Sequence, residues 1–269
     1  MSELSWAFER AKAEGRTALI PYLMAGFPEP GAEVELAVAL ERAGADVLEI
    51  GMPFSDPLAD GPTVQNAGTR SLAAGTTMSD CIAVAASVRR RTSLPLVLMG
   101  YYNPLLAYGL ERFCADAAAA GVCGLILPDL PPEEAGEMQA AARSCGLDIV
   151  YLVSPTSPEE RIREVASVAS GFIYCVSLTG VTGARESVAV GLEEYLSRVR
   201  AHTDLPLAVG FGISRPEHVR QVGAVADGVV VASALLDVID AAAPEERTAA
   251  VEEYIGSLRT AAEREVQKV

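Results

Sequence analysis

The segment PLAVGFGISRPEHVRQVGAVADGVVVAS, residues 206–233, holds the unit from which the fold can be inferred. Its two apolar runs, 206–212 and 227–233, are expected to form strands, because nearly continuous hydrophobicity suits a strand covered on both faces. The polar stretch between them predicts a helix that starts at the capping-box pattern Ser214-Arg215-Pro216-Glu217. A strand, a helix and a second strand in this order are typical of a parallel sheet.

The same alternation of strand and helix extends along the rest of the chain. Helices are expected over 31–43 and after Ser157, which opens a second capping-box pattern, and Gly44 and Gly146 are expected to end helices. Six further apolar runs predict strands: 17–26, 46–51, 95–100, 122–127, 147–153 and 171–177.

Eight strands, each followed by helical sequence, favour one fold over the others. They predict an α/β protein, a (β/α)8 TIM barrel with an extra N-terminal helix and additional short helices, forming a single domain over residues 1–269. A doubly wound sheet is the structural alternative. It is disfavoured because no GxGxxG follows the first strand and no GxxxxGK[ST] occurs in the chain.

Composition narrows the classes of function. The 269 residues include 21 Lys and Arg against 36 Asp and Glu, a formal net charge of −15 that argues against nucleic acid or an anionic membrane as partner. Only two histidines, His202 and His218, are present, and both are expected at helix ends or on polar helix faces. A Ser-His-Asp triad or a multi-histidine metal site is therefore improbable, and acid–base chemistry is expected to rest on carboxylates.

The cysteines and the N-terminus bear on location. The five cysteines form no CxxC pair and lie in apolar surroundings, where cysteine behaves as a small hydrophobic residue. The first 15 residues predict an amphipathic helix instead of a signal peptide, and no apolar run approaches the length of a membrane span. We expect a soluble, reduced, cytoplasmic protein.

Two carboxylates stand out at the end of the second predicted strand, where barrel enzymes place their active sites. Glu49 lies inside the apolar run VLEIG, where an unpaired carboxylate would have a raised pKa and could exchange protons near neutrality. Pairing with Arg or Lys is the structural alternative. Asp60 lies in the proline-rich loop GMPFSDPLADGP, residues 51–62, as a second candidate or as a plain turn former.

Two further segments suit a phosphate and a lid. Gly212 follows the seventh strand and Ala232-Ser233 follows the eighth, in the loops where such barrels bind phosphate at helix N-termini. The polar stretch SLTGVTGARES, residues 177–187, follows the sixth strand and is typical of a mobile lid or of an ordinary solvated loop.

Several motifs together resemble one family. The runs LEIGMPFSDPLADGPTVQNA, YCVSLTGVTGAR and VGFGISRPEHV, with PYLMAGFP, MGYYNP and LPDLPPEE, are similar to the tryptophan synthase α-subunit family nearly end to end. The resemblance implies a (β/α)8 barrel that cleaves indole-3-glycerol phosphate into indole and glyceraldehyde 3-phosphate. It also implies that this chain carries no cofactor.

The resemblance assigns roles residue by residue. It places the catalytic glutamate at Glu49 and the catalytic aspartate at Asp60. Substrate-binding positions fall at Tyr174, beside the active site, at the lid residue Thr182, and at the phosphate-binding positions Gly183, Gly212, Ala232 and Ser233. Ala232 departs from the glycine of many members, which matters only if that position requires a positive φ.

The resemblance also implies a partner. It predicts an αββα heterotetramer with a β subunit that carries pyridoxal phosphate, contacted through the loops after strands two and six and the region of Pro131. Three alternatives stay open: a stand-alone lyase, another phosphate-binding barrel of the same pathway, and a non-catalytic barrel that only activates the β subunit.

Overall fold

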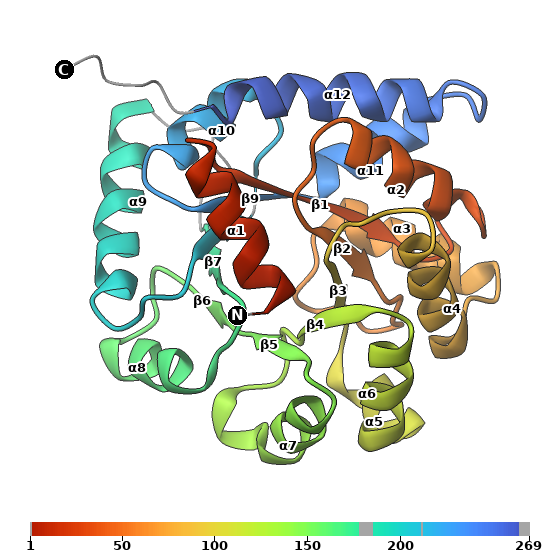
Figure 1. Cartoon of the computed structure of the whole chain (residues 1–269), viewed down its shortest axis with the longest axis horizontal. Helices are drawn as coiled ribbons and strands as arrows, with labels where there is room; N and C mark the ends of the chain where they lie inside the picture. The colour runs from red at the N-terminus through yellow and green to blue at the C-terminus, as the bar shows by residue number, and fades with distance from the viewer. Residues whose placement is uncertain (1, 178–184, 211, 264–269) are drawn as a thin grey trace.

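The computed structural model describes residues 2–177, 185–210 and 212–263, without the side chains of 185–190. Within these described residues, nine parallel strands form a nearly closed barrel surrounded by helices (Figure 1). The strands are β1 Ala18–Met24, β2 Leu48–Gly51, β3 Leu96–Met99, β4 Val122–Ile126, β5 Asp148–Val150, β6 Leu152–Val153, β7 Ile173–Val176, β8 Leu207–Gly210 and β9 Gly228–Val231.

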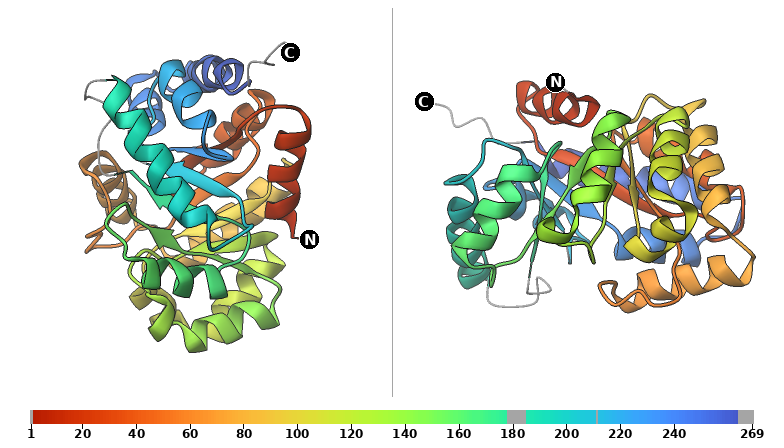
Figure 2. Two further views of the ribbon diagram at one scale, coloured as in Figure 1. Left: turned by 90° about the vertical axis from the view of Figure 1, so that its left-hand side faces the viewer. Right: turned by 90° about the horizontal axis from the view of Figure 1, so that it is seen from below.

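The helices follow the strands around the outside of the barrel (Figures 1 and 2). They are α1 Glu3–Ala13, α2 Ala32–Arg42, α3 Pro62–Ala73, α4 Met78–Arg89, α5 Tyr102–Tyr108, α6 Leu110–Ala119, the 3₁₀ turn η1 Pro132–Glu134, α7 Gly136–Ser144, α8 Glu159–Val168, α9 Arg185–Arg200, α10 Pro216–Gly223, α11 Ser233–Ala241 and α12 Arg247–Ala261. The predicted barrel, its extra N-terminal helix and its additional short helices are confirmed.

The barrel closes within a single predicted strand. The strands follow the order β5-β4-β3-β2-β1-β9-β8-β7-β6. The run predicted as one strand, 147–153, is split at Tyr151 into β5, which pairs with β4, and β6, which pairs with β7. This short segment therefore joins the two edges of the sheet, and the ninth strand comes from its division.

Two apolar layers fill the molecule. The larger lies between the strands and the surrounding helices and includes Leu40, Leu98 and Leu236. The smaller fills the barrel interior, where Leu4 and Phe8 of α1 pack with residues near the strand starts. Phe8 and Phe172, just before β7, have ring centroids 5.3 Å apart. Helix α1 thus covers the N-terminal end of the barrel, and the C-terminal strand ends are left for a site.

Helix boundaries match the sequence expectations only in part. Gly44 and Gly146 adopt the expected left-handed conformation, with φ of 95° and 72°. Both predicted capping boxes are wrong, because α8 and α10 begin one residue later, at caps Pro158 and Arg215 that make no side-chain hydrogen bond. The structure has a capping box at Thr77 and Asp80 instead, at the start of α4.

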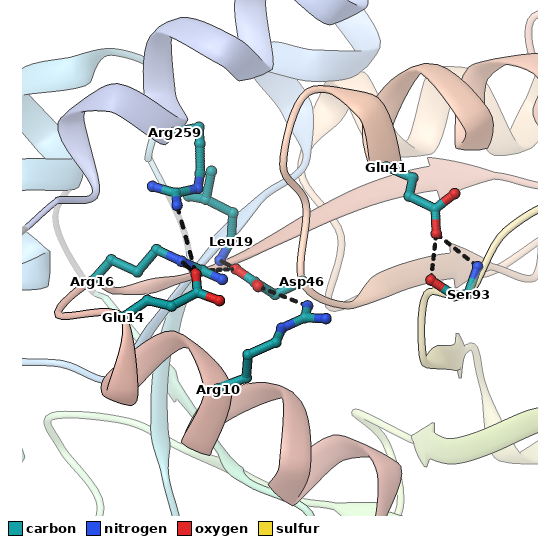
Figure 3. A network of polar contacts seen from close by, with 8 residues as sticks. All are labelled: Arg10, Glu14, Arg16, Leu19, Glu41, Asp46, Ser93 and Arg259. Atoms are coloured by element: carbon teal, nitrogen blue, oxygen red, sulfur yellow. Dashed lines mark hydrogen bonds and ion pairs between the residues drawn. The ribbon is translucent and has the colours of Figure 1, made fainter.

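A buried polar network fastens α1 to the barrel (Figure 3). Asp46, only 1% exposed just before β2, accepts a hydrogen bond from the Leu19 backbone N–H at 2.9 Å. It also forms ion pairs with Arg10 of α1 at 3.2 Å and with the buried Arg16 at 2.5 Å. Arg16 in turn contacts Glu14 at 2.6 Å. One carboxylate therefore connects α1 with the starts of β1 and β2.

We predict that Asp46→Ala lowers the free energy of unfolding by about 3–5 kcal/mol, because the buried Arg16 guanidinium loses its buried partner and keeps only the half-exposed Glu14. The matched control is Asp240→Ala, which removes an exposed ion pair with Arg70 and is expected to cost about 0–1 kcal/mol. Urea unfolding measures both. Equal costs for the two variants would contradict the structural role of Asp46.

Candidate active site

A cavity of about 440 Å³ lies at the C-terminal ends of the strands. Its walls come from segments far apart in the chain, including the ends of β1, β2, β3, β7 and β9 and the loops after β2, β8 and β9. It brings together every predicted site residue that the structure describes: Glu49, Asp60, Tyr174, Gly212, Ala232 and Ser233. Thr182 and Gly183 lie outside the described residues, so the lid stays a prediction.

Glu49 is the buried carboxylate of the cavity. Its side chain, 1% exposed, comes from the middle of β2, and no ion pair among the described residues includes it. Its Oε2 atom is buried without a hydrogen-bond partner in the described part of the chain. Burial, and next the nearby charge of Asp60, raise the pKa of Glu49 to about 8. The alternative of a structural ion pair is therefore not what the structure shows.

Asp60 lies in a turn and also lines the cavity. Its backbone N–H donates to the Pro57 carbonyl at 3.1 Å, and its own carbonyl accepts from the Gln65 side chain at 2.8 Å, just before α3 begins. Burial raises the pKa of Asp60, and a hydrogen bond from Tyr101 partly offsets this effect, so that the resulting pKa is about 6. The loop therefore holds a second carboxylate that ionises more readily than Glu49.

Two tyrosines, Tyr22 and Tyr174, line the cavity, and each lies against a glycine. A Cβ atom added to Gly51 would lie 1.8 Å from the Tyr22 hydroxyl, and one added to Gly210 would lie 2.0 Å from the Tyr174 hydroxyl. No side chain therefore fits at either glycine unless the tyrosine moves. The sequence did not indicate Tyr22 as a site residue. The register of β1 and β2 in the structure identifies it, because Tyr22 lies beside Glu49.

The far side of the cavity suits an anion. Gly212 has a φ of 79°, and Ser233 is the first residue of α11, whose N-cap Ala232 makes no side-chain hydrogen bond. Backbone N–H groups at such a helix start favour phosphate. Ala232 has a φ of −112°, so alanine in place of glycine imposes no strain there.

Residues 2–177, 185–210 and 212–263 contain neither a metal-binding cluster nor a single membrane-spanning helix. That part of the chain contains no group of three or more His, Cys, Asp or Glu side chains that could hold a metal ion. It has no single helix that is long and apolar enough to cross a membrane, although α3 and α4, bent by 105°, pass that test as a pair.

The fold and the cavity define a (β/α)8-barrel protein in which two carboxylates with raised pKa values line one cavity. The sequence model of the tryptophan synthase alpha chain family matches residues 8–263. The tryptophan synthase alpha chain of Roseiflexus castenholzii is 56% identical over 260 residues, covering 96% of this chain and 100% of that protein. That of Chloroflexus aggregans is 52% identical over 265 residues, covering 98% and 99%.

Solved structures agree. The crystal structure of the tryptophan synthase alpha chain from Legionella pneumophila has a TM-score of 0.90 and 37% identity, with 100% of both chains covered. An aminoacrylate-bound tryptophan synthase structure from M. tuberculosis has a TM-score of 0.88 and 35% sequence identity, with 97% of this chain and 100% of that chain covered. The chain belongs to the tryptophan synthase alpha chain family.

We predict that Tyr101→Phe raises the pKa of Asp60 above about 6, because the lost hydroxyl no longer stabilises the ionised carboxylate. Carboxyl ¹³C NMR titration of the variant measures this shift. Tyr151→Phe, which removes a hydroxyl bonded to Gln139 outside the cavity, is the control and should leave Asp60 unchanged. An unchanged Asp60 titration in Tyr101→Phe would contradict the contact.

Proposed function

We propose that this cavity cleaves indole-3-glycerol phosphate into indole and glyceraldehyde 3-phosphate, with Glu49 and Asp60 as the catalytic residues. This carbon–carbon lyase reaction is the one that tryptophan synthase alpha chains catalyse. The observation that carries the assignment is that Glu49 and Asp60 line one cavity and have different pKa values. With a pKa of about 8, Glu49 is protonated at neutral pH and can act as an acid, whereas Asp60, with a pKa of about 6, is an anion.

The reaction requires three events. A proton is delivered to carbon 3 of the indole ring, positive charge is stabilised at the ring nitrogen, and the adjacent side-chain hydroxyl loses its proton as the carbon–carbon bond breaks. Glu49, protonated near neutrality, donates the first proton and then, as a carboxylate, accepts the hydroxyl proton. Its protonation state is thereby restored, and the electron pair of the broken bond stays with the indole ring.

Asp60 takes the electrostatic role. With the lower pKa of the two, it is ionised at neutral pH. It can accept a hydrogen bond from the ring N–H as positive charge develops on the ring nitrogen. A hydrogen bond from Tyr101 lowers the pKa of this carboxylate and so favours its ionised form. A fixed anion that needs no reorganisation stabilises the transition state more effectively than water does.

The remaining cavity residues bind and orient the substrate. Tyr22, Leu152 and Tyr174 contribute ring and aliphatic surface for the indole, and the backbone N–H groups of Gly212, Ala232 and Ser233 bind the phosphate. In support of these roles, all six residues line the cavity. Thr182 and Gly183 keep their proposed lid and phosphate roles. Since protons and electrons balance with carboxylates alone, we propose that this chain requires no cofactor of its own.

We predict that Glu49→Gln lowers kcat by at least about 10³-fold, because the amide can neither donate nor accept the transferred proton. Asp60→Asn should lower it by about 10²–10³-fold through the loss of the anion. Substrate binding, measured by calorimetry, should persist in both variants. Asp56→Asn, in the exposed part of the same loop, is the matched control, and substantial turnover by Glu49→Gln would remove Glu49 from the mechanism.

The pH profile provides an independent test. Because Asp60 must be ionised and Glu49 protonated, kcat/KM should rise with pH through about 6 and fall through about 8. The two limbs belong to the coupled pair, so both should move in Tyr101→Phe. Steady-state rates between pH 5 and 9 would measure the profile, and a rate that keeps rising above pH 9 would contradict a protonated Glu49.

We propose that the chain assembles with a tryptophan synthase β subunit that carries pyridoxal phosphate, as an αββα heterotetramer in the cytoplasm. The M. tuberculosis relative above is a structure of tryptophan synthase. Leu58, 94% exposed in the loop after β2, is the most exposed of the large hydrophobic side chains that the structure describes, and it lies two residues from Asp60. A contact there would connect partner binding directly with the catalytic loop.

We predict that Leu58→Asp weakens association with the β subunit by at least about tenfold, because a charge replaces an apolar contact that the partner buries. Sedimentation velocity with the purified β subunit measures the affinity. Trp6→Gln, which changes an exposed hydrophobic residue at the opposite end of the barrel, should leave it unchanged. Equal affinities for the two variants would exclude the loop from the interface.

A further inference from the structure

The loop after β8 is hydrogen-bonded to His218, a residue to which the predicted capping box assigned no role. The sequence pattern assigned the start of α10 to Ser214 and Glu217. In the structure Arg215 is the N-cap, and His218 occupies the third helical position. The His218 Nδ1 accepts a hydrogen bond from the Ser214 backbone N–H at 3.3 Å and lies 3.4 Å from the Ser214 hydroxyl oxygen.

A second helix holds the same residue from the other side. Tyr254 of α12 donates its hydroxyl to the Ser214 carbonyl at 3.2 Å. Both backbone polar groups of Ser214 therefore have side-chain partners that come from two different helices. With both groups fixed, the orientation of the Ser214 peptide units is set, and Ser214 itself lines the cavity beside Gly212 and Ser233.

His218 is suited to this contact by its burial. It is 7% exposed, although the sequence predicted it on a polar helix face or at a helix end. Burial, and next the charge of Arg215, lower the pKa of His218 below 6.5, which keeps the ring neutral at physiological pH. A neutral imidazole retains one unprotonated nitrogen, which is what the Ser214 N–H requires.

We propose that His218 and Tyr254 are positioning residues that fix the loop Gly212–Ser214 in the conformation that binds the substrate phosphate. They act through Ser214. The inference rests on the proposed function, because it takes the phosphate to bind at this end of the cavity. Glu49 and Asp60 lie in the catalytic part of the cavity, so loss of either positioning contact should weaken substrate binding and leave the chemical step nearly unchanged.

A matched set of variants separates positioning from stability. His218→Leu removes the acceptor at similar size, whereas His218→Asn places an amide oxygen near the position of Nδ1 and can restore the contact. Tyr254→Phe removes only the hydroxyl. Tyr195→Phe is its control, because the Tyr195 hydroxyl also donates to a backbone carbonyl, that of Val153 at 2.8 Å, and Tyr195 does not line the cavity.

Steady-state cleavage of indole-3-glycerol phosphate, and competition by glycerol 3-phosphate, test the proposal. His218→Leu and Tyr254→Phe should each raise KM and the inhibition constant of glycerol 3-phosphate by about tenfold. This is the effect expected when a displaced loop loses one hydrogen bond to the charged phosphate. Their kcat should change less than about twofold. His218→Asn and Tyr195→Phe should keep values close to the unmodified chain.

The outcomes distinguish this inference from the proposed function. If glycerol 3-phosphate fails to compete in the unmodified chain, the phosphate assignment itself is wrong. If it competes there, and Tyr254→Phe and His218→Leu leave KM unchanged, only the positioning roles are overturned. Should His218→Leu fail to fold, Tyr254→Phe still decides, because a rise in KM supports the proposal and an unchanged KM contradicts it. A fall in kcat with constant KM also contradicts it.

Discussion

The burial of one carboxylate is the constraint on which the rest of the site depends. Glu49 lies within a strand that is buried along its whole length, and its Oε2 has no partner among the described residues. A buried carboxyl without a cation is stable mainly in its neutral form, and this is the form that can donate a proton. The surroundings thus give an ordinary glutamate the property that the reaction requires.

The second carboxylate, Asp60, lies in a different environment from Glu49. Asp60 comes from a loop, is half-buried and receives a hydrogen bond from Tyr101, so its ionised form is less costly than that of Glu49. The two groups influence each other through their charges, because ionised Asp60 makes deprotonation of Glu49 harder. Two residues of nearly identical chemistry are therefore suited to the different roles proposed for them because their surroundings differ.

The barrel separates stability from chemistry at its two ends. At the N-terminal end, α1 packs into the barrel and Asp46 connects it with β1 and β2 through ion pairs and a backbone hydrogen bond. At the C-terminal end, unpaired carboxyl oxygen and helix-start N–H groups face a cavity. Ion pairs and a backbone hydrogen bond thus hold the N-terminal end together, whereas the C-terminal end presents a carboxyl oxygen without a partner among the described residues to the cavity.

Much of this could be predicted from sequence, for physical reasons that also mark the limits. Continuous apolar runs identified every strand segment, and Glu49 stood out because a carboxylate in such a run is expensive. The division at Tyr151 was not visible, because it depends on pairing with β4 and β7, which are distant in the chain. Tyr22 and His218 were missed as site residues because their roles arise from strand register and from contacts between helices.

The decisive measurement is indole release from indole-3-glycerol phosphate by the purified chain, alone and with its β subunit. We expect equal amounts of indole and glyceraldehyde 3-phosphate, formed slowly by the chain alone and much faster in the complex. Fast release without the partner would support a stand-alone lyase instead. A folded sample that releases no indole in either case would contradict the assignment of Glu49 and Asp60 as catalytic residues.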